Sequence, residues 1–328
     1  MEQEFVLPIK KRYRSQNNES PIEVPDILPN AIFDYTSYPK MLLNPHGVFE
    51  EIRVLGAGSY GLVILIRVKS NNKLYALKLI NVMDWRSRNT LETFKTEVEI
   101  LISISIYPDC DPNIVCYYES FQLYYKPKFA AAATSYYAIV MEYVEGITLD
   151  DYIKTHTMTK EIAGKILLWL TSVIASLHAK DIVHRDIKPL NIMILPDDTL
   201  KLIDFGLGCL INGPFEDYCR RIVGTPHFVA PETAENHLFL LDLEYWKKND
   251  VFSAGVTLYQ VVEGINVHPY NIASGFRLNP ELRLMTWSDN CYNSIVYEML
   301  IPNPFDRPDA ADVNEKFQKQ CILPMLNE

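Results

Sequence analysis

Short runs of β-branched and aromatic residues, separated by turn residues, dominate the chain between residues 48 and 142. The runs at 62–68 and 74–80 lie on either side of a pair of asparagines, a pattern typical of a strand meander. Two further strands are predicted at 115–123 and 136–142. The sequence therefore predicts a β-rich region that follows a polar first segment.

A helical period replaces the strand pattern elsewhere in the chain. Asn89, with Glu92 three positions later as in a capping box, predicts a helix that continues to about Ser105. After Gly146 the chain becomes mainly helical, because apolar residues between 162 and 177 recur at the spacing of one buried helix face. Further helices are predicted at 250–262, 292–300 and 310–320. The expected fold class is therefore α+β.

Two segments show neither period. Residues 1–48 are rich in Pro, Asn, Ser and charge, which predicts an N-terminal extension that is partly disordered. Residues 124–135 are longer than a hairpin loop requires, which predicts an exposed insertion. Within the insertion, the run Ala130–Ala133 is either a short helical turn or an engineered replacement.

Length and charge narrow the classes of function. With 328 residues, 48% of them hydrophobic, the chain is long enough for two domains or two lobes around a buried core. The net charge of −10 argues against a general nucleic-acid binder, which needs cations to neutralise phosphates. The basic run at 10–14 is a local exception, either a solvated tail or a localisation signal.

The cysteines and the apolar stretches predict the compartment. Six cysteines are dispersed without a Cys-x-x-Cys pair, and we expect reduced thiols, not a zinc site or a disulfide framework. The N-terminus lacks the apolar region of a secretory signal. The longest apolar stretches are broken, for example by Lys165, and fall short of the roughly 18 residues of a membrane span. A soluble protein of the cytoplasm or nucleus, without membrane binding, is expected.

The strongest chemical signal is a polar segment followed by a turn: His184-Arg185-Asp186-Ile187-Lys188-Pro189-Leu190-Asn191, and then Asp204-Phe205-Gly206. Phosphoryl transfer requires a carboxylate that orients the attacking hydroxyl, an ammonium that neutralises charge, and an amide and a second carboxylate that hold Mg²⁺. Each piece alone could be structural. The combination, in this order and spacing, favours phosphoryl transfer.

A glycine-rich segment, Gly56-x-Gly58-x-x-Gly61, precedes one of the predicted strands. Dinucleotide-binding folds carry the same spacing, but there the glycines open a helix. Here they lead directly into a run rich in Val and Ile, which excludes a Rossmann unit. The segment therefore predicts a hairpin whose backbone N–H groups can approach phosphates.

These segments resemble those of eukaryotic-type protein kinases over roughly residues 49–320. The resemblance implies a bilobal protein-kinase fold, with an N-lobe at 49–141, a hinge at 142–148 and a C-lobe at 149–328. It also implies ATP and Mg²⁺ as cofactors. Lys188 two positions after the catalytic Asp, and a Gly-Thr-Pro segment before Ala-Pro-Glu, are similar to the serine/threonine branch.

The resemblance also implies roles for single residues. Asp186 would orient the substrate hydroxyl and Lys188 would contact the γ-phosphate. Asn191 and Asp204 would bind Mg²⁺, and Lys78 would contact the α- and β-phosphates. The implied nucleotide site, including Met141 as gatekeeper, Val63 over the adenine and Met193 beneath it, comprises Gly56, Gly58, Gly61, Val63, Ala76, Lys78, Met141, Glu142, Val144 and Met193.

The helix after the first strands offers three glutamates as partner of Lys78. Glu97 lies three residues after Phe94 and projects from the apolar face of the helix. Glu92 belongs to the cap, and Glu99 has an exposed setting. We therefore expect Glu97 to pair with Lys78, which also fits the kinase pattern.

The activation segment, residues 207–223, departs from the family pattern. It contains no Ser or Thr, its only hydroxyl is Tyr218, and Arg221 occupies the usual phosphothreonine position. We therefore expect that activity does not require Ser/Thr phosphorylation in this segment. A carboxylate from Glu216 or Asp217 would then satisfy the arginine that binds phosphate in relatives.

Two structural roles follow from the resemblance. Glu232 is expected to form a buried ion pair with Arg307, and Asp250 is expected to anchor the catalytic loop from the start of its helix. Positions at which basophilic relatives carry glutamates hold other residues here, so a preference for Arg upstream of the acceptor is not expected. These positions are Thr148, Leu190 and Gln260.

Three functions remain distinct at this point. The full catalytic set favours an active protein serine/threonine kinase with protein substrates. The alternative is a pseudokinase-like nucleotide-binding scaffold that acts through partners, with a regulatory partner at the N-terminal extension. A kinase of small molecules is disfavoured by the segment Gly224–Glu232, which in protein kinases shapes the peptide platform.

Overall fold

The computed structural model falls into two compact units, whose main boundary lies between Tyr143 and Val144. The first unit also contains 101–111 and 116–143, and the second contains 95–100 and 112–115. The predicted extension lies outside the described residues except for Val48, and so does the alanine run. The structure describes residues 48–58, 61–82, 90–129, 134–213, 216–233, 243–264, 270–271, 277–278 and 290–322.

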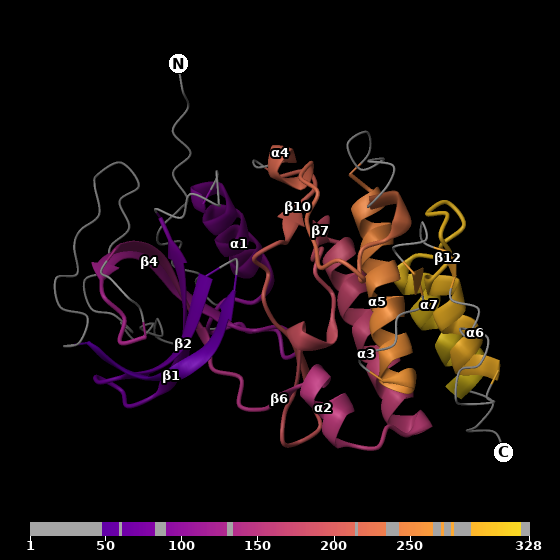
Figure 1. Ribbon diagram of the computed structural model, residues 1–328, viewed down its shortest axis with the longest axis horizontal. Helices are drawn as coiled ribbons and strands as arrows, with labels where there is room; N and C mark the ends of the chain where they lie inside the picture. Colours follow the sequence, from indigo (N-terminus) through magenta and orange to yellow (C-terminus); the bar gives the residue numbers. More distant parts are fainter. Residues whose placement is uncertain are drawn as a thin grey trace, which may run out of the picture. The chain divides into compact units, whose positions relative to one another are not determined.

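The first unit is built on a five-stranded antiparallel sheet with the order β1-β2-β3-β5-β4 (Figure 1). Its strands are β1 (Phe49–Gly58), β2 (Gly61–Val68), β3 (Leu74–Asn81), β4 (Tyr117–Tyr125) and β5 (Thr134–Glu142). The sheet buries one apolar cluster that includes Ile64, Leu77 and Val140. Burial of such side chains is the main stabilising term for a sheet.

The predicted insertion at 124–135 is partly sheet, because β4 and β5 continue into it from both sides. Three of its four remaining described residues are exposed, as predicted, and one of them, Lys128, is bound to β1. Lys128 donates its backbone N–H to the Glu51 carboxylate at 2.9 Å and its Nζ to the Glu51 carbonyl at 3.1 Å. The connection is therefore bound to the sheet edge more closely than the sequence indicated.

Helix α1 (Thr90–Ile104) begins one residue after the predicted cap, which lies outside the described residues. Phe94 and Leu101 are fully buried on its apolar face. The middle of the helix belongs to the second unit, where the side chain of Ile100 lies 3.0 Å from the position a Cβ would take on Gly208.

The second unit is mainly helical (Figure 1). Helix α3 packs against α5 and α7, and α6 packs against both α5 and α7. Helix α5 is buried along almost its whole length and begins five residues earlier than predicted. The helices are α2 (Leu149–Thr155), α3 (Lys160–His178), α4 (Glu216–Cys219), α5 (Tyr245–Glu263), α6 (Asn290–Met299) and α7 (Ala310–Phe317).

Short strands in the second unit position the loops between its helices. One sheet has the order β6-β8-β9, and β10 pairs with β7. A third pair joins β11 and β12. The strands are β6 (Ile147–Thr148), β7 (Ile182–Val183), β8 (Ile192–Ile194), β9 (Leu200–Leu202), β10 (Cys209–Leu210), β11 (Tyr270–Asn271) and β12 (Arg277–Leu278).

Among the described helices, α3 alone is long and apolar enough to cross a membrane, so the expectation that every apolar stretch is too short is wrong for this helix. Its packing explains its composition. Eight of its residues are buried, and its neighbours are α5 and α7. A core helix of a folded domain passes the same test of length and composition, and α3 is such a helix.

The six cysteines form three disulfides, so the prediction of reduced thiols is wrong. The sequence separations are 6, 10 and 30 residues, with Cα–Cα distances of 5.3, 5.5 and 5.8 Å. The fold brings the partners together, and no short Cys spacing announces this in the sequence. The argument from free thiols to a reducing compartment therefore no longer holds. The pairs are Cys110–Cys116, Cys209–Cys219 and Cys291–Cys321.

Candidate active site

The carboxylate of Asp250 on α5 binds the backbone of the catalytic loop. Its Oδ2 accepts the N–H of His184 and its Oδ1 accepts the N–H of Arg185, both at 2.8 Å. His178 at the end of α3 places its Nε2 3.2 Å from the same carboxylate. The predicted anchor is confirmed, although Asp250 lies in the second turn of its helix and not at its start.

Asp186 is the centre of a hydrogen-bonded cluster. Lys188 donates to its Oδ2 at 2.7 Å, and Asn191 donates its side-chain amide to Oδ2 at 3.0 Å and to the carbonyl at 2.8 Å. Thr225 donates its hydroxyl to Oδ1 at 2.6 Å and accepts from Lys188 at 2.7 Å. The cluster places a carboxylate beside an ammonium, the pair that hydroxyl activation and phosphate neutralisation need.

Thr225 contacts both Asp186 and Lys188, and the sequence indicated it only as part of a Gly-Thr-Pro segment. Its position depends on Gly224, which has φ +122°, a region that side chains disfavour. A Cβ on Gly224 would lie 2.6 Å from Val229 and 3.1 Å from the carbonyl of Arg185. In the sequence, a glycine immediately before a threonine was the only feature that could have indicated the position of Thr225.

Two substitutions of Thr225 should distinguish the contribution of its hydroxyl to activity from that of its side-chain volume. Thr225→Val removes the donor to the Asp186 carboxylate, and we expect kcat to fall about tenfold or more, because hydrogen bonds to charged groups contribute roughly 1.5–3 kcal/mol. Thr225→Ser keeps the hydroxyl and should retain most of the activity. Steady-state phosphorylation of a peptide would measure both, and equal losses in the two variants would contradict the role of the hydroxyl.

Asp204 lies beside the catalytic loop. The N–H of Ile203 donates to the carbonyl of Asn191 at 2.9 Å, and His184 places its Nε2 3.2 Å from the carbonyl of Ile203. Asp204 has φ +62° and accepts the N–H of Gly206 at 3.3 Å. The two predicted metal ligands thus come from adjoining backbone segments of one unit.

The residues of this region fit Mg²⁺ bound together with a nucleotide. Within the described residues, the side chain of Asn191 forms its hydrogen bonds through Nδ2, which leaves Oδ1 for a cation. The described part of the chain contains no group of three or more His, Cys, Asp and Glu side chains that could hold a metal. Mg²⁺ does not require one, because it commonly combines one or two carboxylates with substrate phosphates.

The sheet of the first unit brings the predicted adenine-site residues onto one face. Val63 on β2 is opposite Lys78 on β3, and Ala76 on β3 is opposite Met141 on β5. Opposed residues in antiparallel strands share a face, and so do residues two apart on one strand. Lys78, Ala76 and Met141 are all at most 7% exposed.

The glycine-rich segment is a β-hairpin in which Gly58 pairs with Gly61. Gly61 has φ +129°, and a Cβ there would lie 2.4 Å from the carbonyl oxygen of Leu79. Positions 56 and 58 face open space, with no atom within 4 Å of a built Cβ. This arrangement suits close approach of a phosphate to backbone N–H groups.

Glu97 and Lys78 are both buried, with exposed fractions of 1% and 3%, and belong to different units. Glu92 is exposed, and partial burial raises the pKa of Glu99. Burial thus distinguishes Glu97 from the other two glutamates in the way the helical period indicated. Pairing of Glu97 with Lys78 stays a prediction.

The remaining predicted nucleotide residues are Glu142 in the first unit and Val144 and Met193 in the second. The N–H of Glu142 donates to the carbonyl of Cys116 at 2.9 Å, so its backbone carbonyl is the group that could meet an adenine amino group. Val144 is buried. In the second unit, Met193 on β8 is opposite Thr148 on β6.

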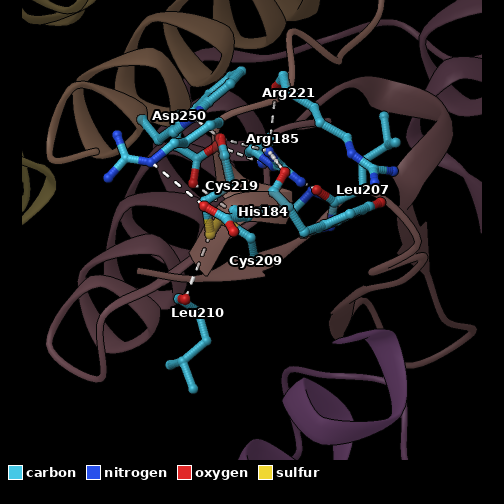
Figure 2. Close-up of a disulfide and its surroundings, with 12 residues drawn as sticks. His184, Arg185, Leu207, Cys209, Leu210, Cys219, Arg221 and Asp250 are labelled. Atoms are coloured by element: carbon cyan, nitrogen blue, oxygen red, sulfur yellow. Dashed lines mark hydrogen bonds and ion pairs between the residues drawn. A yellow bond between two sulfur atoms is a disulfide. The ribbon is translucent and has the colours of Figure 1, made fainter. Parts of the chain in front are cut away.

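Arg185 contacts the activation segment through backbone carbonyls (Figure 2). Its Nε donates to the carbonyl of Leu207 at 2.6 Å, and its Nη1 donates to the carbonyls of Tyr218 and Cys219 at 3.3 and 3.1 Å. Asp217 does not supply the carboxylate expected for Arg185, because it is fully exposed and pairs with Arg220. The side chain of Glu216, the other candidate, lies outside the described residues.

Tyr218, the one hydroxyl of the activation segment, is 4% exposed. Its hydroxyl donates to the carbonyl of Gly206 at 3.2 Å. The guanidinium carbons of Arg185 and Arg221 lie 5.0 and 4.8 Å from its ring centroid, within the range of cation–π attraction. In this conformation the phenol is enclosed and is not accessible to a modifying enzyme.

Asp181 joins the start of β7 to α5. Hydrogen bonds from Lys247 at 2.8 Å, and then from Asn212 at 2.9 Å, lower the pKa of its carboxyl. Its carbonyl accepts the N–H of Ile211 just after β10. These contacts hold the strand pair that leads into the catalytic loop.

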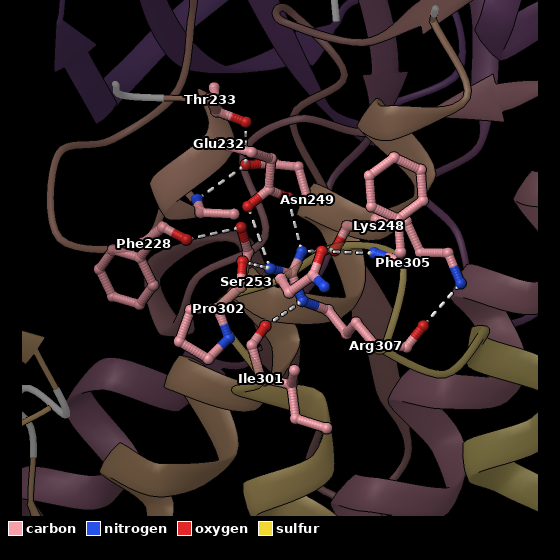
Figure 3. A network of polar contacts seen from close by, with 12 residues as sticks. Phe228, Glu232, Thr233, Lys248, Asn249, Ser253, Ile301, Pro302, Phe305 and Arg307 are labelled. Carbon is pink, nitrogen blue, oxygen red and sulfur yellow. Dashed lines mark hydrogen bonds and ion pairs between the residues drawn. The ribbon is translucent and has the colours of Figure 1, made fainter. Parts of the chain in front are cut away.

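Glu232 and Arg307 form the predicted buried ion pair, which is confirmed (Figure 3). Two parallel hydrogen bonds of 2.7 and 3.0 Å join the guanidinium to the carboxylate, and the two side chains are 0% and 2% exposed. Arg307 also donates to the carbonyls of Lys248, Ile301 and Pro302. Full use of the guanidinium donors is the condition under which a buried pair is tolerated.

A carboxylate–lysine–asparagine cluster, a neighbouring Asp-Phe-Gly turn, and a glycine-rich hairpin in a separate sheet are features of the protein kinase class. The sequence matches the protein kinase domain family over residues 49–317, and the chain belongs to that family. The expected bilobal kinase fold is consistent with a five-stranded sheet in one unit and helices in the other.

Curated relatives carry the same class name. The chain is 31% identical to serine/threonine-protein kinase Nek3 of Mus musculus over 79% of its length, and 32% identical to serine/threonine-protein kinase cds1 of Schizosaccharomyces pombe over 68%. It is 29% identical to serine/threonine-protein kinase PrkC of Bacillus subtilis over 66%. The chain covers 47%, 46% and 31% of these relatives, so it spans half their length or less.

Proposed function

We propose that this protein is an ATP-dependent kinase that transfers the γ-phosphate of Mg-ATP to serine and threonine hydroxyls of protein substrates. The observation that carries the proposal is the cluster of Asp186, Lys188 and Thr225, joined by hydrogen bonds of 2.6–2.7 Å. The class of the relatives supports it.

Each residue of the cluster has a defined task in this proposal. Asp186 accepts the hydrogen bond of the acceptor hydroxyl and takes its proton, and Lys188 meets the γ-phosphate. Asn191 and Asp204 hold Mg²⁺, which, when bound, neutralises phosphate charge. Thr225 keeps the Asp186 carboxylate oriented through its 2.6 Å hydrogen bond. Positioning and charge neutralisation supply most of the rate in such reactions.

Each unit contributes its own residues to the proposed nucleotide set. In the first unit, the sheet face of Val63, Ala76 and Met141 suits adenine, and the open glycines suit phosphates. Lys78, paired with Glu97, would contact the α- and β-phosphates. The full proposed set is Gly56, Gly58, Gly61, Val63, Ala76, Lys78, Met141, Glu142, Val144 and Met193.

Incubation with Mg-ATP and a generic protein substrate, followed by mass-spectrometric assignment of the modified residues, tests the proposal. Phosphate on Ser or Thr would support it. Binding of ATP without transfer would instead favour the scaffold alternative, in which the chain signals through partners at its N-terminal extension.

We further propose that activity does not depend on Ser/Thr phosphorylation in the activation segment. The contacts of Arg185 with Leu207, Tyr218 and Cys219 support this, because backbone carbonyls occupy donors that relatives use for phosphate. Treatment with a broad-specificity protein phosphatase should leave the transfer rate within about twofold. Mock-treated protein is the control, and a loss that recovers on rephosphorylation would contradict the proposal.

Protein substrates with Ser/Thr acceptors are proposed as partners, and the net charge of −10 supports the absence of general nucleic-acid binding. A cytoplasmic or nuclear location also stays a proposal. Thiol trapping in intact cells, combined with fractionation, would test it and would show whether the three cysteine pairs are oxidised there.

A further inference from the structure

The disulfide Cys209–Cys219 lies at the base of the activation segment (Figure 2). Cys209 is on β10, which pairs with β7 just before the catalytic loop, and Cys219 ends α4. Both cysteines are fully buried in an apolar cluster with Val183 and Trp246. The bond therefore joins the far part of the segment to the strand that supports the catalytic loop.

The carbonyl of Cys219 is a shared acceptor for two side chains of the second unit. It accepts Nη1 of Arg185 at 3.1 Å and Nε1 of Trp246 at 2.7 Å. The guanidinium carbon of Arg185 lies 5.0 Å from the ring centroids of both Trp246 and Tyr218. Arg185 directly precedes Asp186, so the position of Cys219 is coupled to the catalytic loop through one side chain.

Neutral carbonyls are weaker acceptors for a guanidinium than a phosphate or carboxylate is. The contacts of Arg185 alone would therefore restrain the segment less than the phosphate bridge of a phosphorylated relative. A covalent bond between Cys209 and Cys219 restricts the chain between them and so reduces the number of open conformations available to it. A covalent restraint of this kind can compensate for weaker polar contacts.

We propose that the Cys209–Cys219 disulfide is the tether that orders the activation segment, so that phosphoryl transfer requires this pair to be oxidised. The proposal rests on the kinase activity proposed above and adds its regulation. It places control of the segment on a redox reaction instead of on a protein kinase. Breaking the tether releases Cys219, and with it the carbonyl that holds Arg185 and Trp246.

The redox step is a two-electron exchange. Reduction by a dithiol proceeds through two thiol–disulfide exchanges: both cysteines gain a proton and the dithiol becomes a disulfide. Oxidation by a hydroperoxide follows a different route. One thiolate attacks the peroxide and breaks its O–O bond, which gives a sulfenic acid and releases an alcohol, or water where the oxidant is hydrogen peroxide. The second thiol then attacks the sulfenic sulfur, closes the S–S bond and releases water. Because both sulfurs are buried, either reaction requires the segment to open first.

The test compares oxidised and dithiothreitol-reduced protein. Two variants separate this pair from the other four cysteines: Cys209→Ser/Cys219→Ser lacks the tether, and a matched variant keeps it while the other four are serine. Peptide phosphorylation, ATP binding and amide hydrogen exchange of residues 216–223 are measured on each. Hydrogen exchange reports the order of the segment independently of activity.

Reduction of the wild type and of the tether-only variant should lower kcat/KM about tenfold and speed exchange in the segment, with ATP affinity unchanged. Reoxidation should restore both, and the tether-less variant should resemble reduced protein under either condition. Unchanged exchange and unchanged kcat/KM on reduction would overturn the proposal. If oxidised protein transfers no phosphate, but reduction still speeds hydrogen exchange in the activation segment, the proposed kinase activity is wrong. The role of the disulfide in ordering the segment is then retained.

Discussion

Asp186→Asn is expected to lower kcat for peptide phosphorylation by about 10³-fold, within the range found for general-base groups. The carboxylate accepts hydrogen bonds from Lys188, Asn191 and Thr225. An amide of the same shape turns one acceptor into a donor, which would face either Thr225 or Lys188. The variant loses the general base, and the side chains around it lose their orientation. Single-turnover kinetics would measure the rate of the chemical step, and steady-state kinetics would measure kcat and the KM for ATP.

The matched control is Asp217→Asn. Asp217 is fully exposed and its distance to Arg220 is 4.0 Å, so its charge has little structural role. We expect its kcat to stay within about twofold of the wild type. ATP binding should be retained in both variants, and a similar loss of kcat in both would contradict the assignment of Asp186 as the base.

Loss of the Glu232–Arg307 pair should give the largest change in stability. Arg307→Met leaves a buried carboxylate without its partner and removes the hydrogen-bond donor of three backbone carbonyls. We therefore expect the free energy of unfolding to fall by about 3–5 kcal/mol. For a domain of this size, that lowers Tm by roughly 10 °C. Thermal unfolding followed by circular dichroism would measure it.

An exposed pair provides the comparison. Lys165 and Glu161 are 2.8 Å apart on α3 and are 70% and 77% exposed, so Lys165→Ala should leave the free energy of unfolding nearly unchanged. The double variant Glu232→Gln/Arg307→Met should recover part of the loss, because it removes the unpaired charge. A small effect of Arg307→Met alone would contradict a large contribution of this guanidinium, through the ion pair or the carbonyls, to the stability of the region.

The sequence was most informative where function depends on short contiguous motifs. Asp186, Lys188 and Asn191 lie within six positions, and their chemistry is legible without knowledge of the fold. The inward face of α1 was also predictable, since Phe94 and Glu97 follow one helical period. Asp250 and the Glu232–Arg307 pair came from family resemblance. The structure confirms both sets of contacts, although Asp250 lies in the second turn of α5 and not at its start.

The parts that were missed depend on long-range packing or on backbone acceptors. Arg185 binds carbonyl oxygens, and every residue has a carbonyl, so no sequence signal distinguishes Leu207 or Cys219 as its partner. Charge alone suggested the carboxylate of Glu216 or Asp217 instead. Trp246 was likewise outside the predicted start of α5, because the two lysines and the asparagine that follow it interrupt the apolar pattern.

The burial of Tyr218 makes its phosphorylation depend on the conformation of the activation segment. Its hydroxyl contacts Gly206 and its ring lies beneath two guanidinium groups, so a modifying enzyme can reach it only while the segment is open. A phosphate added at that moment would carry a charge of about −2 and could not return to the buried position without a large desolvation penalty. Phosphorylated Tyr218 would therefore keep the segment open until a phosphatase removed the phosphate.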